Sequence, residues 1–218
     1  MAERTGEGGG EALLRWVAYA MMGFTALALA WVLYIRTHPS PAQALGLHTL
    51  WKVPAFSLTD QAGRPFGTAQ LAGKVAVVDF IYTRCGASCP TLTAQMAKLQ
   101  AAFKGQAGLQ FVSISVDPLH DTPAVLARYG RQFGADFGGW AFLTGPPARV
   151  DALMQVGFKV PVVQVQVDEA GSQVVDIPHT SSLALLDRQG RIRAFYEGIE
   201  EDSWPKLTQA LRVLLAER

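Results

Sequence analysis

The sequence predicts an α/β domain that follows a single N-terminal transmembrane helix, and three observations lead to this prediction. A run of twenty residues near the N-terminus, 16–35, carries no charge. Further along, apolar β-branched runs alternate with stretches of helical periodicity, the pattern of a sheet covered by helices. The two cysteines, Cys85 and Cys89, lie together where one such strand passes into a helix. They therefore indicate a functional site rather than a disulfide framework.

The composition excludes several classes of protein before any motif is considered. A length of 218 residues leaves room for one ordinary domain and an appendage. Half of the residues are hydrophobic and 17% are charged, which excludes an intrinsically disordered protein. The 19 Lys and Arg residues balance 18 Asp and Glu residues without long blocks of either sign, so no nucleic-acid partner is expected.

Residues 16–35 are expected to form a retained membrane anchor. At about 1.5 Å per residue, a helix of this length spans the roughly 30 Å of a bilayer's hydrocarbon layer. Trp16 and Tyr19 at one end, and Trp31 and Tyr34 at the other, suit rings at headgroup depth. A buried core helix is rarely apolar on every face. A cleaved signal peptide has a shorter apolar region and a small-residue cleavage site, whereas this run ends in YIRTHP.

The charges that flank this helix predict its orientation. Arg4, Arg15 and the amino terminus precede it, while Arg36 alone follows closely. Because an excess of Lys and Arg marks the cytoplasmic side, residues 1–15 are expected to be a disordered cytoplasmic tail. The domain then lies outside the cytoplasm, which in a Gram-negative bacterium is the periplasmic side of the inner membrane.

The domain is expected to span residues 55–218, after a proline-containing tether over 36–54 that has no clear periodicity. It opens with a short β segment at 55–60. Nearly continuous apolar runs at 74–82 and 109–117 predict strands that are buried on both faces. Between them a helix is predicted by apolar residues at helical spacing, namely Leu92, Met96, Leu99 and Phe103.

Capping residues and a short apolar run define the next elements. Thr122 is expected to cap a helix that has Pro123 at its first position. A short strand near 140–144 and a helix over about 147–156 follow.

Two hairpins and a final helix complete the prediction. Residues 160–177 alternate between apolar and polar and contain a turn signal at 169–171, which predicts an inserted β-hairpin. A second hairpin is expected to turn at 188–190, and Ser203 is expected to cap a C-terminal helix with a leucine stripe. A strand–loop–cysteine–helix unit followed by a late hairpin is the order of a thioredoxin-like fold.

The cysteine pair forms a C-x3-C motif at the edge of the sheet where open α/β folds bind ligands. Unpaired N–H groups and the dipole at a helix start would favour the thiolate form of Cys89. If residues 85–89 are helical, the two Cα atoms lie about 6 Å apart, within disulfide range. The pair can therefore oxidise reversibly or present two sulfurs to one metal ion.

Two thiolates leave a metal site incomplete, which points to a histidine ligand. His179 precedes the predicted strand at 181–187, and if this strand runs antiparallel to 74–82, His179 lies at the same edge as Cys85. His120 lies on another loop of that edge and is the competing candidate. A zinc site usually contains a second close pair of Cys or His residues, which this chain lacks.

Three motifs in order give the chain a family resemblance: CGASCP at 85–90, VDPLHDTPAVLARYG at 116–130 and PHTSSLALLDRQGRI at 178–192. Together they resemble the Sco/SenC family of membrane-anchored, thioredoxin-like copper proteins of cytochrome c oxidase assembly. The resemblance covers roughly residues 55–215, and the anchor also fits it.

The resemblance implies a copper site whose ligands are Cys85, Cys89 and His179. Soft thiolates select Cu(I), and a neutral imidazole suits both Cu(I) and Cu(II). Asp117 and Asp121 fall on the family's DP-x-x-DT-P motif. Asp117 is a candidate for orienting the site, and Asp121 is a candidate either for that role or, with Thr122, for helix capping.

One departure from the family pattern concerns the loop between the cysteines. Many members have proline directly after the first cysteine, where this chain has Gly86. Glycine at this position is expected to loosen the loop.

The resemblance further implies a copper metallochaperone rather than an enzyme. It would deliver one copper ion to the binuclear copper centre of cytochrome c oxidase. Its partners would be that oxidase subunit, a thiol reductant and another copper chaperone. The alternative is a thiol–disulfide reductase that keeps the oxidase cysteines reduced through Cys85 and Cys89 alone. A peroxiredoxin shares the fold but places Thr or Ser three residues before its reactive cysteine, whereas Thr83 is two residues before Cys85.

Overall fold

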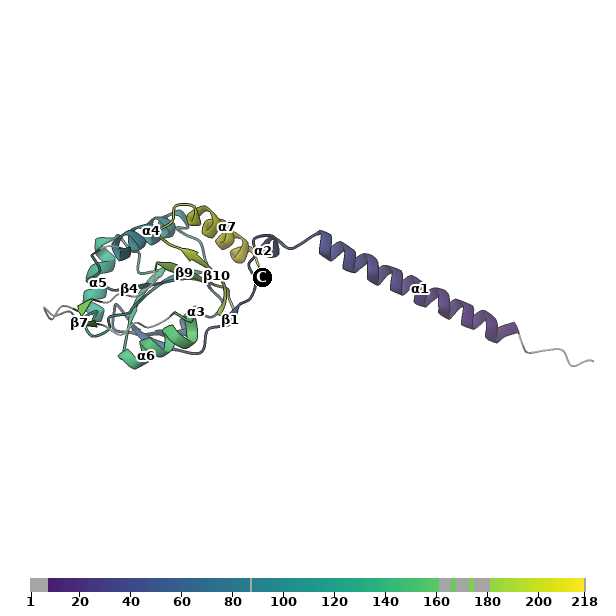
Figure 1. Cartoon of the computed structure of the whole chain (residues 1–218), viewed down its shortest axis with the longest axis horizontal. Coiled ribbons are helices and arrows are strands. Elements are labelled where there is room, and N and C mark those ends of the chain that lie inside the picture. The colour runs from purple at the N-terminus through teal and green to yellow at the C-terminus, as the bar shows by residue number, and fades with distance from the viewer. Residues whose placement is uncertain (1–7, 87, 161–165, 168–172, 175–180, 218) are drawn as a thin grey trace, which may run out of the picture. The chain divides into compact units, whose positions relative to one another are not determined.

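The computed structural model describes residues 8–86, 88–160, 166–167, 173–174 and 181–217 (Figure 1). The chain divides into two compact units, residues 1–44 and 45–218.

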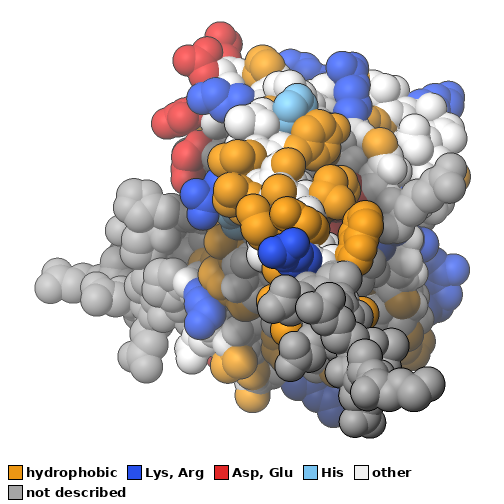
Figure 2. All heavy atoms as spheres, turned by 90° about the vertical axis from the view of Figure 1, so that its right-hand side faces the viewer, with side chains coloured by type: hydrophobic (Ala, Val, Ile, Leu, Met, Phe, Trp, Pro, Cys, Tyr) orange, Lys and Arg blue, Asp and Glu red, His pale blue; other side chains and the backbone are white. Residues whose placement is uncertain are grey.

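The first unit is helical. It consists of α1 (Gly8–Thr37) and the short α2 (Pro41–Ala44). Within α1, the 22 residues Leu13–Tyr34 have a mean hydropathy of 1.7, so this helix is long and apolar enough to cross a membrane. Figure 2 shows one face of the molecule, with hydrophobic side chains gathered near the centre of the view. The helix begins inside the segment 1–15 that was expected to be a tail, so it extends past the predicted anchor at both ends.

The second unit contains an eight-stranded sheet with the order β1-β10-β9-β4-β5-β6-β2-β3. Strands β4, β5 and β6 are parallel, and β9 runs antiparallel to both β4 and β10. This is the arrangement predicted for a thioredoxin-like fold. The strands are β1 (Trp51–Lys52), β2 (Ser57–Asp60), β3 (Pro65–Gly67), β4 (Val75–Ile81), β5 (Leu109–Ser115), β6 (Trp140–Thr144), β9 (Ser182–Leu186) and β10 (Arg191–Glu197).

Helices cover both faces of this sheet, so that every side chain of β4 is buried. Figure 1 shows α4, α5 and α7 over one face and α3 and α6 over the other. The helices are α3 (Thr68–Leu71), α4 (Ser88–Ala102), α5 (Pro123–Gln132), α6 (Pro147–Ala152) with its π-helical continuation η1 (Leu153–Phe158), and α7 (Ser203–Ala216). Because strand side chains alternate between faces, Val78 and Phe80 pack with Leu153 and Phe158 of η1, and Asp79 points to the face under α4 and α5.

The inserted hairpin is confirmed by β7 (Gln166–Val167) and β8 (Gln173–Val174), which pair antiparallel. Its predicted turn at 169–171 lies outside the described residues.

Local capping signals gave one correct and one wrong prediction. The Thr122 hydroxyl accepts a hydrogen bond from the Val125 N–H at 3.4 Å, so it caps α5 as expected. Ser203 does not cap α7 but is its first residue, and the preceding Asp202 has a helical conformation and makes no side-chain cap bond.

Strand β1 lies inside the segment 36–54 that was predicted to be a tether. Its two residues pair with Ile192 and Arg191 of β10 at the edge of the sheet. A two-residue edge strand is too short to show a period of its own, which explains why the sequence pattern did not reveal it.

Candidate metal and redox site

The cysteine pair lies in the connection between β4 and α4. Cys85 is half-buried and Cys89 is 3% exposed, and both are thiols. The Cys85 N–H donates to the Tyr82 carbonyl at 3.2 Å, and the Cys89 N–H donates to the Cys85 Sγ at 3.4 Å. This last bond holds the first sulfur over the opening turn of α4, one helical turn from the second cysteine.

Burial, rather than the helix terminus, dominates the protonation of Cys89. Its pKa is raised to about 12, mainly because the thiol is removed from water, and the neighbouring Cys85 and Asp79 also act to raise it. The expectation that the start of α4 would favour the thiolate of Cys89 is therefore wrong for the metal-free protein. The half-exposed Cys85 is the sulfur that meets an incoming molecule first.

Asp121 fixes the backbone just ahead of the cysteines. Its side chain is completely buried and accepts hydrogen bonds from the Thr83 N–H at 3.1 Å, the Thr83 hydroxyl and the Ser115 hydroxyl. Thr83 is the second residue of the loop after β4, and Ser115 is the last residue of β5. Asp121 therefore connects the start of the cysteine loop to the neighbouring strand β5. Helix capping, which Thr122 performs, does not explain why the Asp121 side chain is buried here.

Asp117 fixes the next residue of the same loop. Its Oδ2 accepts from Arg84 Nη2 at 2.7 Å and from Arg84 Nε at 3.1 Å, while its Oδ1 lies 2.8 Å from His120 Nδ1. Asp117 itself is 7% exposed. The residue immediately before Cys85 is thus held by a nearly buried carboxylate, and His120 is held in the same cluster.

A cluster of buried polar side chains lies behind Cys89, between the sheet and helices α4 and α5. Asp79, in the middle of β4, is completely buried, and no described residue hydrogen bonds to either of its carboxyl oxygens. Its pairing neighbour on β5 is Ser113, whose hydroxyl accepts the Trp140 indole N–H at 2.9 Å. Burial raises the pKa of Asp79 to about 7.

On the helical side of this cluster lies a pair of hydroxyl groups. Thr93 Oγ1 of α4 and Tyr129 Oη of α5 lie 2.9 Å apart, and both side chains are buried. Burial raises the pKa of Tyr129, and the nearby Cys89 and Asp79 add to the increase. The phenol is therefore a neutral hydroxyl in this cluster.

The structure brings four of the predicted residues into one edge of the sheet. Cys85 and Cys89 share the loop after β4, and Asp117 and Asp121 hold residues 83 and 84 of that loop. His179, the predicted third ligand, lies outside the described residues. Within the described ranges no group of three His, Cys, Asp or Glu side chains is arranged to hold a metal ion.

Two residues of this region were missed at the sequence level. Asp79 is the single charged residue in the otherwise apolar strand β4. A charged residue inside an apolar run could have been recognised from the sequence as a candidate for a special role. Arg84 gave no signal, because its importance comes from contact with Asp117, 33 residues further along the chain.

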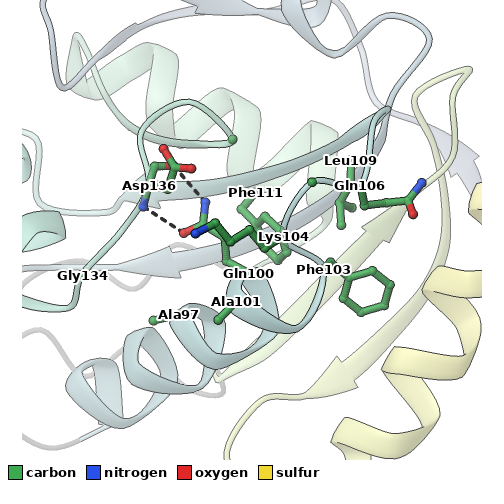
Figure 3. Close-up of a pocket in the computed structure, with 12 residues that line it drawn as sticks. Ala97, Gln100, Ala101, Phe103, Lys104, Gln106, Leu109, Phe111, Gly134 and Asp136 are labelled. Carbon is green, nitrogen blue, oxygen red and sulfur yellow. Dashed lines mark hydrogen bonds between the residues drawn. The ribbon is translucent and has the colours of Figure 1, made fainter.

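A separate pocket of about 420 Å³ lies at the other end of α4 (Figure 3). Gln100 spans it by donating to the Asp136 carbonyl at 2.8 Å and accepting from the Asp136 N–H at 2.9 Å. Its lining contains no cysteine or histidine. It lies beside the start of β5, at Leu109, whereas the cysteines follow the end of β4, so it is not part of the site.

A protein-family model for SCO1/SenC matches residues 49–216. The chain belongs to the SCO1/SenC family. This match covers the whole sheet, the cysteine loop and the loop that contains Asp117 and Asp121, so the resemblance inferred from the three motifs is confirmed.

Individual Sco proteins agree with this assignment. The SCO1 protein homolog of Bacillus subtilis is 32% identical over 152 residues, covering 69% of this chain and 76% of that protein. The structure of BsSco, a Sco-family cytochrome c oxidase assembly protein with a disulfide switch, is 28% identical with a TM-score of 0.67, covering 78% and 98%. The copper-bound structure of Bradyrhizobium japonicum ScoI is 29% identical with a TM-score of 0.63, covering 75% and 99%. The thioredoxin-like Sco fold is thereby confirmed.

Proposed function

We propose that this Sco protein binds one copper ion through Cys85, Cys89 and His179 and delivers it to the binuclear copper centre of cytochrome c oxidase. The observation that carries the proposal is the placement of two thiols within one helical turn, with the Cys89 N–H on the Cys85 sulfur at 3.4 Å. Copper binding and oxidase assembly are the functions of the Sco relatives.

The donor set suits copper as cargo. Thiolate sulfurs favour Cu(I), and adding an imidazole allows Cu(II) to be held as well. Because burial keeps Cys89 protonated in the empty protein, copper must displace that proton, so loading weakens as the pH falls. The half-exposed Cys85 then offers the accessible side from which an acceptor's ligands take the ion.

Asp117 and Asp121 support this site without touching the metal. They hold Arg84 and Thr83, the two residues ahead of Cys85, by five hydrogen bonds that join the loop to β5 and its following loop. Supporting contacts of this kind orient ligands and raise affinity.

The apolar helix α1 fits membrane anchoring, and the charge balance around it favours a domain on the periplasmic side. The proposed acceptor is the oxidase subunit that contains the copper centre. A thiol reductant and a second copper chaperone would supply the reduced cysteines and the ion.

The disulfide switch of BsSco favours thiol–disulfide reduction as the second candidate function. In that reaction Cys85 and Cys89 lose two electrons and two protons and form one disulfide. The partner's disulfide takes up the same electrons and protons and becomes two thiols. The oxidised pair has no thiolate to offer copper, so the two functions use different states of the same residues.

Copper analysis of the reduced unit 45–218 tests the ligand set. One equivalent of copper is expected to bind, and Cys85→Ser, Cys89→Ser and His179→Ala are each expected to lose it. His120→Ala is the matched control, because His120 competed for the same role. Retention of copper by His179→Ala together with its loss in His120→Ala would reverse the assignment.

Complementation separates the two functions. If His179→Ala abolishes copper binding but still supports oxidase assembly in cells, delivery is excluded and reduction by the cysteine pair remains. If His179→Ala fails while an added reductant does not rescue assembly, delivery is supported.

A further inference from the structure

A second surface of the globular unit plays no part in the copper site. We define the aromatic face as Trp51, Val156 and Phe195. Val156 is 65% exposed and Phe195 36%, while Trp51 is partly exposed. Exposed apolar side chains that gather in this way mark a surface that contacts something.

Trp51 is held rigidly at the centre of this face. Its indole N–H donates to the Gly157 carbonyl at 2.8 Å, and its ring lies 5.9 Å from that of Phe195. The Lys159 ammonium lies 5.1 Å from the Trp51 ring centroid. The Trp51 ring can therefore contact a partner without rearranging, and the Lys159 ammonium already lies beside it.

An apolar hollow of about 380 Å³ adjoins the aromatic face, with Phe56, Leu153 and Val156 in its lining. Gly157 joins the two, because its carbonyl accepts the Trp51 indole N–H and a Cβ at this position would lie 2.8 Å from Leu153 Cδ1 of the hollow. Apolar surface thus continues from Trp51 into the hollow.

The charges around the aromatic face are mainly positive. Lys52, Arg149 and Lys159 are exposed at its edges. In the segments that form it, 50–58, 149–159 and 191–195, the sequence has one carboxylate, Asp151. Protein–protein interfaces are depleted of lysine, whereas lysine stems beside Trp and Phe are typical of the interface between a membrane and water.

The chain connection keeps this face near a membrane. Residues 38–50, thirteen in all, separate the end of α1 at Thr37 from Trp51. Fully extended, they reach at most about 45 Å. Once α1 is inserted, contact between the aromatic face and the bilayer is effectively intramolecular, so even weak attraction suffices.

We propose that the aromatic face lies on the surface of an anionic bilayer. The ring of Trp51 would sit at headgroup depth, and Lys52, Arg149 and Lys159 would pair with lipid phosphates. The inference rests on the membrane anchoring in the proposed function.

This contact would set the direction of the copper site. Trp51 pairs with Ile192 near the start of β10, whereas Cys85 follows the end of β4, and β10 runs parallel to β4 because both are antiparallel to β9. The aromatic face therefore lies toward the ends of the strands that are opposite the cysteines. With the aromatic face on lipid, the cysteines point away from the membrane, toward a partner's soluble domain.

Fluorine NMR of the full chain tests this directly. The chain is labelled with fluorotryptophan and reconstituted in phosphatidylcholine–phosphatidylglycerol nanodiscs whose headgroups carry a spin label. Its five tryptophans are Trp16, Trp31, Trp51, Trp140 and Trp204, and Trp51→Phe assigns the critical line. The Trp51 line is expected to be lost to broadening together with those of Trp16 and Trp31, while Trp140 and Trp204 remain.

Charge reversal supplies the matched comparison. Lys52→Glu combined with Lys159→Glu is expected to restore the Trp51 line, whereas Lys104→Glu, in the exposed turn that follows α4, is expected to leave it broadened. The Trp140 line, from a fully buried ring, reports that each variant is folded. Equal loss of the Trp51 line in phosphatidylcholine alone would overturn the anionic part of the proposal.

Two outcomes separate this inference from the proposed function. If Trp16 and Trp31 broaden but Trp51 stays as sharp as Trp204, the chain is anchored and the lipid contact is wrong. If Trp16 and Trp31 also stay sharp, the anchoring itself is wrong. A Trp51 line that persists in nanodiscs and shifts only when oxidase is added would assign the face to a protein and overturn the proposal.

Discussion

Two buried carboxyl groups flank the cysteine loop, Asp121 in front of it and Asp79 behind it. Both are 0% exposed, yet Asp121 accepts hydrogen bonds from Thr83 and Ser115, while no described residue hydrogen bonds to Asp79. Burial costs a carboxylate free energy unless hydrogen bonds replace water. The front carboxyl therefore holds the loop together, and the rear carboxyl makes the protein sensitive to pH.

The two regions divide the work of the site in the same way. In front, fixed ion pairs and hydrogen bonds set the path of residues 83–85. Behind, Asp79, to which no described residue hydrogen bonds, lies near the Thr93–Tyr129 hydroxyl pair, and burial in this region opposes negative charge on Cys89. Geometry and protonation are thus controlled from opposite sides of one loop.

The largest expected effect concerns the rear carboxyl. Asp79 has a pKa of about 7 in the folded protein against 3.8 for an unperturbed group. The unfolded chain thus releases this proton first as the pH rises. The stabilisation that protonated Asp79 gives the folded protein is fully present below about pH 4 and is lost as the pH rises through 7. This loss amounts to about 4 kcal/mol in the free energy of unfolding. The Asp79→Asn variant should not show this loss of stability. Urea unfolding of the copper-free unit 45–218 across that pH range measures the difference.

Glu201→Gln serves as the control for this experiment, because Glu201 is an exposed carboxyl. Its pH profile should follow that of the wild type. An Asp79→Asn profile that also matched the wild type would show that the rear carboxyl is not the pH-sensitive group.

The front carboxyl should have a slightly smaller effect. Asp121→Ala leaves the Thr83 N–H and the Ser115 hydroxyl without their acceptor and should lower the free energy of unfolding by about 3 kcal/mol. Asp121→Asn keeps one acceptor oxygen, so its free energy of unfolding should lie between those of the wild type and Asp121→Ala. Urea unfolding at neutral pH measures all three proteins, and equal stability of the alanine and asparagine variants would contradict a role based on accepted hydrogen bonds.

A smaller loss is expected for Arg84→Gln. Its ion pair with Asp117 is short, but the arginine side chain is 45% exposed, so solvent screening limits the loss to about 1 kcal/mol. Thermal unfolding compares it with Arg128→Gln, an exposed arginine on α5. If Arg84→Gln loses no more stability than Arg128→Gln, the Arg84–Asp117 ion pair positions the loop without stabilising the fold.

The smallest effect is a gain at Gly86. A Cβ at this position would meet nothing within 4 Å, and the backbone is outside the left-handed region that favours glycine. Gly86→Ala should therefore raise the free energy of unfolding by about 0.5 kcal/mol, because alanine restricts the unfolded chain. Urea unfolding should detect the increase, and a decrease would mean that the loop between the cysteines needs glycine.

The parts of the fold predicted from sequence are those set by local pattern. The continuous apolar runs of β4 and β5 follow from burial on both faces, and the Thr122–Pro123 cap follows from the chemistry of one helix start. The cysteine pair was found because it stands at a strand–helix junction.

The parts that were not predicted depend on residues distant in the chain. The protonation of Cys89 was judged from the helix start alone, whereas burial by the surrounding core decides it. Asp79 becomes unusual only once α4 and α5 close over it, and Arg84 only once Asp117 reaches it. The position of His179 lies outside the described residues, so the third ligand stays a prediction.

The bond between Thr83 and Asp121 joins residues that are 38 positions apart. During synthesis, both sulfurs leave the ribosome before the carboxyl group that fixes the path of their loop. Contacts of such long range form only when the two parallel strands have already paired. A newly made chain therefore passes through a period in which both thiols are present but the path of their loop is not yet fixed.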